Sequence, residues 1–158
     1  MSLQKYLLDL YGFEKSLHEI ISEIVKKNES TIIGLVKNRL YQHGVDGTGN
    51  LIEPEYKIST VLMKKEENKR SGFVTLRDEG LFYGGFYVEM QGYDLILNST
   101  DGKTSSLVSK YGEAILHFTK EEQDFIFLTM IEPGIEDVIN SLERNSESAS
   151  GGLEMDFF

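Results

Sequence analysis

The sequence predicts an α+β fold in which N-terminal helices and C-terminal helices pack on a small antiparallel β-sheet or hairpin. Three observations predict it. Apolar residues recur at helical spacing near the N-terminus and again after residue 119, and they alternate with other residues between positions 86 and 98. No internal repeat or second core-sized unit is evident, so we expect one α+β domain over residues 1–144. An extended arm at about 56–77 and a flexible linker with a C-terminal tail at 145–158 complete the prediction.

The N-terminal part predicts two helices. The first runs from about Leu3 to Lys27 and carries one apolar stripe, which consists of Leu17, Ile20, Ile21, Ile24 and Val25. The second is expected over about 29–42, with Asn28 or Ser30 as its N-cap. The pair forms either one long helix kinked near Asn28 or a helical hairpin, and the sequence does not distinguish the two.

The segment 56–77 carries the predicted arm. Weak alternation around Ile58 and Leu62 indicates a strand, and a polar stretch follows it. The segment has two acidic residues against six basic ones: Lys57, Lys64, Lys65, Lys69, Arg70 and Arg77. We expect an exposed arm or long hairpin, with a simple solvated loop as the alternative.

The second half of the chain predicts one hairpin and several helices. Residues 86–98 alternate as a β-hairpin does, with Gly92 near its turn. A short helix is expected over 107–112, ended by a glycine. Thr119 precedes two glutamates, which is the pattern of a helix N-cap, and Pro133 opens a further helix at its first turn.

The net charge of −10 is unevenly distributed. Residues 113–158 contain eleven acidic residues against two basic ones, whereas the preceding 112 residues are close to balance. A general nucleic-acid-binding protein would present a basic face, so this distribution argues against that class. The alternative is a solvated acidic surface that keeps the protein soluble.

No residue pattern predicts catalysis or a metal site. Cysteine is absent, which excludes disulfides, thiolate zinc sites and cysteine nucleophiles. The three histidines lack metal-ligand spacing, and no nucleophile motif accompanies them. A loop starting at Asp46 resembles a calcium loop, but Leu51 replaces the required glycine and Lys57 replaces the bidentate glutamate. Its glycines match no phosphate-binding pattern. We therefore expect no enzyme and no cofactor.

No segment approaches the roughly 20 apolar residues that span a bilayer. The N-terminus mixes charged residues into its apolar positions and lacks the uninterrupted apolar stretch of a signal peptide. We expect a soluble, intracellular protein without a membrane partner.

The last residues form an acidic-aromatic tail after a Ser/Gly-rich segment. Glu154 and Asp156 separate its apolar members, which are Leu153, Met155, Phe157 and Phe158. Such a tail can anchor in a partner's groove or add a strand to a sheet edge. Folding back on its own domain is the alternative.

From Arg39 to about Glu143 the order of features resembles a known family. A helix leads into the segment Arg39-Leu-Tyr-Gln-His-Gly-Val-Asp-Gly-Thr-Gly-Asn-Leu-Ile-Glu-Pro54, and the basic segment follows. Then come Thr75-Leu-Arg-Asp-Glu-Gly-Leu-Phe-Tyr83, the hairpin and Leu107-Val-Ser-Lys-Tyr-Gly112. This order is similar to that of the tail-completion and neck proteins of tailed bacteriophages. Glu79 departs from the family pattern, in which threonine usually precedes the glycine.

The resemblance implies a structural virion protein without catalytic residues or cofactors. It implies a ring, a hexamer or a dodecamer, that is assembled in the host cytoplasm and lies in the virion neck. Portal or adaptor proteins and tail proteins would be its partners, and DNA would pass through the channel without sequence-specific binding. The alternative is an intracellular adaptor or regulatory module that binds a partner protein through its acidic-aromatic tail.

Within the ring, two sets of side chains are the candidate partner-binding residues. The basic set would reach an acidic surface on a neighbour, and the tail set would anchor in a partner. The basic set is Lys64, Lys65, Lys69 and Arg70, and the tail set is Leu153, Met155, Phe157 and Phe158.

Overall fold

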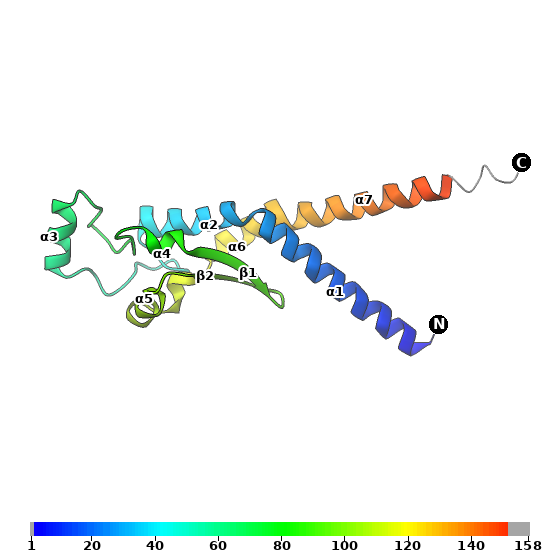
Figure 1. The fold of residues 1–158 in the computed structure, drawn as a ribbon, viewed down its shortest axis with the longest axis horizontal. Helices are drawn as coiled ribbons and strands as arrows, with labels where there is room; N and C mark the ends of the chain where they lie inside the picture. Colours follow the sequence, from blue (N-terminus) through cyan, green and yellow to red (C-terminus); the bar gives the residue numbers. More distant parts are fainter. Residues whose placement is uncertain (1, 152–158) are drawn as a thin grey trace, which may run out of the picture.

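The computed structural model describes residues 2–151 and confirms the α+β class, with helices around one two-stranded antiparallel sheet. In chain order the elements are α1 (Leu3–Lys27), α2 (Glu29–Asn38), η1 (Arg39–His43), α3 (Ile58–Glu66), α4 (Leu81–Gly84), β1 (Phe86–Gln91), β2 (Asp94–Ser99), α5 (Thr104–Tyr111), η2 (Glu113–Leu116), α6 (Lys120–Ile126), η3 (Phe127–Ile131) and α7 (Glu132–Gly151). Figure 1 shows α1 and α7 diverging on one side of the molecule, whereas α3 lies at the opposite end.

The two N-terminal helices are confirmed, and they form one bent rod rather than a hairpin. The Ser2 hydroxyl accepts a hydrogen bond from the Lys5 N–H at 3.2 Å and caps the start of α1. Asn28, at φ −101° and ψ 9°, interrupts the helical geometry, and α2 continues at an angle (Figure 1). The rod ends in the π-helical turn η1.

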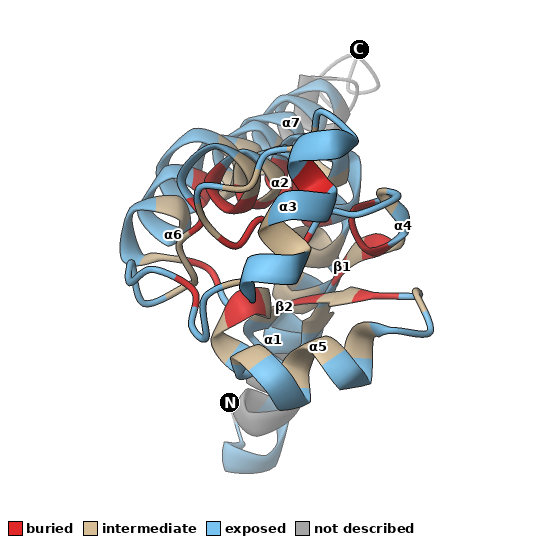
Figure 2. Ribbon diagram, turned by 90° about the vertical axis from the view of Figure 1, so that its left-hand side faces the viewer, coloured by how far each residue is buried: buried red, intermediate tan, exposed pale blue. Residues whose placement is uncertain are grey.

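The hairpin is confirmed, with Gly92 in its turn. Phe86 pairs with Ser99 and Val88 with Leu97, and the apolar members of this face point into the core. Both α1 and α2 pack against β1. The core lies where α2, the hairpin and the segment 115–126 meet, and Figure 2 shows buried residues on these elements. Its fully buried members include Ile32, Val36, Leu40, Ile115 and Ile126.

The C-terminal helices follow one another without a loop. Thr119 caps α6 as predicted, and the π-helical turn η3 joins α6 to α7. Pro133 lies in the first turn of α7, where its missing N–H and its ring favour a widened preceding turn. Near this point the chain packs closely on α1, because a Cβ added at Gly134 would lie 2.7 Å from Ile24 Cδ1.

Two of the expected elements differ from the structure. The strand expected around Ile58 and Leu62 is wrong, because these residues lie in the helix α3 with 80% and 56% of their surface exposed. Their alternation therefore marks no buried face. The flexible linker expected after Arg144 is also wrong as far as Gly151, because α7 continues to that residue. The tail residues beyond it lie outside the described residues.

Between positions 2 and 151, no helix combines the length and the apolar character needed to cross a bilayer.

Gly47 lies so close to the segment before α6 that alanine should destabilise the fold. A Cβ there would lie 2.5 Å from His117 Cβ and 2.6 Å from the His117 carbonyl oxygen. We expect Gly47→Ala to lower the free energy of unfolding by about 1–3 kcal/mol, measured by urea denaturation. The control is Gly34→Ala in α2, where the added Cβ meets nothing within 4 Å. It should gain roughly 0.5–1 kcal/mol. Equal effects of the two substitutions would contradict this packing.

Candidate interaction site

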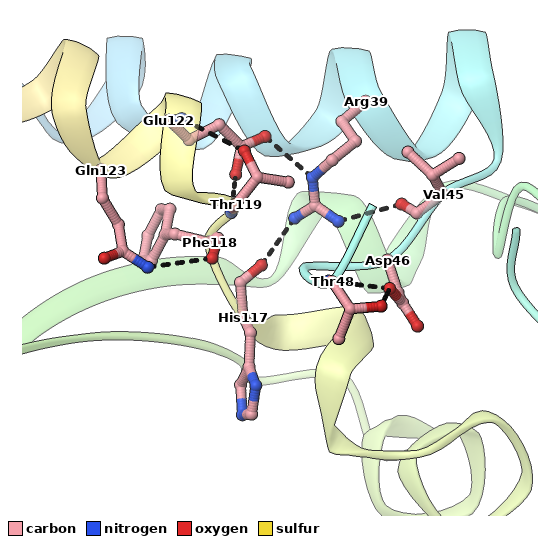
Figure 3. Close-up of polar contacts among 9 residues, drawn as sticks. All are labelled: Arg39, Val45, Asp46, Thr48, His117, Phe118, Thr119, Glu122 and Gln123. Carbon is pink, nitrogen blue, oxygen red and sulfur yellow. Dashed lines mark hydrogen bonds and ion pairs between the residues drawn. The ribbon is translucent and has the colours of Figure 1, made fainter. Parts of the chain in front are cut away.

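Arg39 is a buried cation that binds three parts of the chain at once (Figure 3). Its Nε donates to Glu122 Oε1 at 2.8 Å, its Nη1 to the Val45 carbonyl at 2.9 Å and its Nη2 to the His117 carbonyl at 2.7 Å. These bonds join η1 to the glycine-rich loop (residues 44–50), to the segment before α6 and to α6 itself.

The second oxygen of Glu122 completes a capping box. Glu122 Oε2 accepts from the Thr119 N–H at 2.9 Å, while the Thr119 hydroxyl accepts from the Glu122 N–H at 3.1 Å. Both carboxylate oxygens are therefore engaged within the fold. The ion pair is a structural clamp between segments far apart in sequence, and no substrate needs to be invoked to explain it.

The loop that resembles a calcium site holds itself together. The Asp46 carboxylate accepts from the Thr48 N–H at 2.8 Å, which forms an Asx turn. Within the described residues, no group of three or more histidine, aspartate or glutamate side chains could hold a metal ion.

The basic side chains expected to form one exposed set are divided by the structure. Lys64 is only 6% exposed, so its expected place on an exposed arm is wrong. Its Nζ donates to the Arg77 carbonyl at 2.9 Å and lies 4.9 Å from the centre of the Tyr56 ring. The aromatic ring and the carbonyl together compensate for the lost hydration of this ammonium group.

The other three residues lie nearer to solvent. Lys69 pairs with Glu67 at 2.7 Å and with Asp78 at 2.8 Å. The hydrogen bond with Asp78 is the largest cause that raises the pKa of Lys69, and the same bond lowers the pKa of Asp78. The Arg70 guanidinium lies 4.9 Å from the Tyr41 ring centre. Lys65 is exposed and has no side-chain partner in the part of the chain that the structure describes.

An apolar pocket of about 220 Å³ opens beside α3. It lies between α3, α4 and α5, the elements that face the viewer in Figure 2. Its apolar and aromatic lining comes from Tyr56, Met63, Leu76, Leu81, Phe82, Leu107 and Tyr111. Its lining also includes three basic residues, Lys64, Arg77 and Lys103, and three acidic ones, Asp78, Glu79 and Asp101. We call this cavity the α3 pocket.

Hydrogen bonds with two tyrosine hydroxyls hold the backbone of Thr75, which is next to the α3 pocket. The Tyr83 hydroxyl donates to the Thr75 carbonyl, and burial raises the pKa of Tyr83. The Tyr56 hydroxyl accepts from the Thr75 N–H at 3.0 Å. Thr75 itself is 1% exposed, and it precedes Leu76 in the pocket lining. These contacts fix the chain around Thr75, which follows the basic residues Lys69 and Arg70.

A wider groove follows β2 and shares Asp101 with the lining of the α3 pocket. It has a volume of about 1060 Å³ and runs between β2, α5 and α6. Its carboxylate lining residues are Asp94, Asp101 and Glu113, with His117 and Tyr93 beside them, and no lysine or arginine is among the described lining residues. The sequence did not predict either cavity, because each is lined by segments far apart along the chain.

The tail residues Leu153, Met155, Phe157 and Phe158 lie outside the described residues, so the structure does not place them. No protein-family model matches the chain, and neither curated proteins nor solved structures give a significant match.

Removing the Arg39 guanidinium should destabilise the whole fold. Arg39→Met leaves Glu122 without its cation and leaves two carbonyls without a donor, so we expect a loss of about 3–5 kcal/mol in unfolding free energy. The control is Arg144→Met on the exposed surface of α7, which should change stability by less than about 0.5 kcal/mol. Denaturant unfolding measures both. Similar losses from the two variants would show that Arg39 is not a clamp.

Asp78 should titrate below the usual range of an aspartate. A pH titration of its carboxyl carbon by NMR should give a lowered pKa, and Lys69→Met should raise that pKa toward the ordinary value. Lys65→Met serves as the control and should leave it unchanged. Because the pKa of Asp78 is lower in the folded state than in the unfolded state, the ion pair contributes its full stabilisation at pH values above the unfolded-state pKa. That stabilisation is lost as the pH falls through the folded pKa. If Lys69→Met left the pKa of Asp78 unchanged, the ion pair would be disproved.

Proposed function

We propose that this chain is a non-catalytic structural subunit that assembles into a ring in the neck of a tailed-phage virion. The ring would join the portal and capsid side to the tail. One structural observation carries the self-assembly part of this proposal: two long helices extend from a small core with apolar side chains exposed. The virion setting comes from the resemblance of residues 39–143 to tail-completion and neck proteins.

Both projecting helices leave large apolar side chains exposed among the residues whose burial the structure describes. A 25-residue helix is about 37 Å long. Its C-terminal half contributes to the core, where Val25 is 2% exposed, while Phe13 remains 66% exposed. On α7, Ile139 and Leu142 are 49% and 62% exposed. Helices in water gain most of their stability from packing an apolar face, which favours a partner for both. We propose further copies of this chain as that partner.

The two ends of the molecule differ in charge. α7 carries five acidic residues against one basic residue, and it extends away from the end that holds α3 (Figure 1). The segment 56–77 at that other end carries six basic residues against two acidic ones. Contact between unlike ends of successive copies is heterologous, and such contacts close into rings when the rotation permits. This polarity supports a ring, of six or twelve copies by the resemblance.

The environments of the titratable groups support a role without catalysis. Lys69, Asp78 and Tyr83 have shifted pKa values, and each shift has a structural cause. An ion pair accounts for the first two, and burial accounts for the third. In the proposed assembly the partners are portal or adaptor proteins and tail proteins. DNA passes through the channel without sequence-specific binding.

Exposed apolar residues of α7 should stabilise the assembly. The full chain should form rings in native mass spectrometry and negative-stain microscopy over a concentration series. Ile139→Ser combined with Leu142→Ser removes apolar surface that is worth about 1.5–3 kcal/mol per side chain if it is fully buried in the contact. The dissociation constant of the contact between copies should then rise by at least about tenfold. The matched control is Ser141→Ala between them, which should leave the rings unchanged.

A chain that stays monomeric at every concentration, with no response to these substitutions, would contradict self-assembly. A monomer that instead captures one cellular protein through residues 151–158 would favour the intracellular adaptor over the ring subunit.

A further inference from the structure

We infer that the α3 pocket of one copy receives the acidic-aromatic tail of the next copy, with Phe157 or Phe158 as the inserted side chain. The inference rests on the proposed function in taking a second copy as the source of the tail. It adds a specific receptor, which the charge of the two ends alone does not identify.

The size and lining of the pocket suit one aromatic ring. An engineered apolar cavity of about 150 Å³ can bind benzene, and the α3 pocket has about 220 Å³. Its lining includes the rings of Tyr56, Phe82 and Tyr111 together with Met63, whose thioether packs well against aromatic groups. Met63 is 52% exposed and Leu81 is 58% exposed, so an occupant would cover apolar surface that is now open to water.

The charge around the pocket suits an acidic segment. Three cations and three carboxylates line it, and one member of each set is already engaged: Lys64 with the Arg77 carbonyl and Asp78 with Lys69. Outside the lining, the adjoining segment 56–77 holds four further basic residues against two acidic ones. The lining and this segment together hold seven basic residues against five acidic ones, so Glu154 and Asp156 of an incoming tail would meet a net positive surface, with Arg77 and Lys103 in the lining.

The groove along β2 offers the opposite environment. Asp94, Asp101 and Glu113 line it without a lysine or arginine. An acidic tail entering that groove would bring like charges together, which is unfavourable. Between the two cavities, the charge therefore favours the α3 pocket as the receptor.

Chain length excludes docking within one copy. The 20 residues of α7 span about 30 Å and lead away from the end of the molecule that holds α3, α4 and α5 (Figure 1). The seven residues after Gly151 reach at most about 25 Å when fully extended. Residue 158 therefore cannot return even to the start of α7, and the pocket lies farther still. The tail must come from another copy.

Peptide binding tests the receptor directly. The probe is a fluorescent peptide of residues 145–158, and the receptor is the full chain carrying Phe157→Ser and Phe158→Ser, which keeps the pocket unoccupied. We expect saturable binding by fluorescence anisotropy. A probe with both phenylalanines replaced by serine should bind at least about tenfold more weakly.

Two pairs of receptor variants separate the pocket from its surroundings. Met63→Glu places a carboxylate in the pocket and should weaken binding at least about tenfold. Leu62→Glu, on the same helix but outside the lining, is the matched control and should have little effect. Lys103→Glu should weaken binding, and Lys65→Glu, outside the lining, should do so less. Equal effects within the Met63 and Leu62 pair would overturn the inference. NMR shift changes centred on residues 94–99 rather than on α3 and α5 would also overturn it.

A mixing experiment tests the exchange between copies. A full chain with Met63→Glu has a blocked pocket and an intact tail, and the double phenylalanine variant has the reverse. Mixed together, they should form a one-to-one complex through the remaining pocket and tail, whereas each alone should lack this contact. Failure of the mixture to associate more than either variant alone would overturn the inference. Normal rings formed by both variants would overturn it too, while leaving the proposed ring function intact.

Discussion

The ion pair between Arg39 and Glu122 is the constraint on which the rest of the fold depends. It joins residues 83 positions apart, and the bond from Arg39 to the His117 carbonyl spans 78 positions. A buried guanidinium is tolerated only when its donors are satisfied, so η1, the glycine-rich loop and the start of α6 must meet at one point. Because η3 continues α6 directly into α7, this clamp also sets where α7 leaves the core.

Local signals in the sequence were sufficient for much of the fold. The Thr119 cap and the hairpin at 86–98 depend on neighbouring residues, and both are confirmed. The clamp was not predictable: helical spacing from Ile32 and Val36 puts Arg39 on the apolar face of its helix, but nothing nearby in sequence identifies a partner for its charge. That partner is the distant Glu122. The strand predicted around Ile58 was wrong because its alternation covers only three residues, a pattern that fits a short exposed helix equally well.

The candidate site was less predictable than the fold for the same reason. Sequence grouped Lys64, Lys65, Lys69 and Arg70 by proximity along the chain, but one turn of helix and one loop direct them differently. Lys64 turns inward to the Arg77 carbonyl, Lys69 binds Asp78, and Arg70 covers Tyr41. The α3 pocket depends on α3, α4, α5 and the loop before α4. Its composition is visible only after these four segments have been brought together.

The helical state of residues 145–151 changes what the tail can do. A flexible chain from 145 to 158 could extend about 48 Å and search the surface of its own domain. That arrangement would give a high effective concentration for docking within one copy and would compete with assembly. As part of α7, the same residues instead carry the tail about 10 Å farther outward. A rigid spacer of this kind removes the intramolecular competitor without any repulsive contact. In the proposed exchange between copies, the length of α7 is therefore a determinant of partner choice, because a flexible segment over 145–151 would let the tail search its own domain.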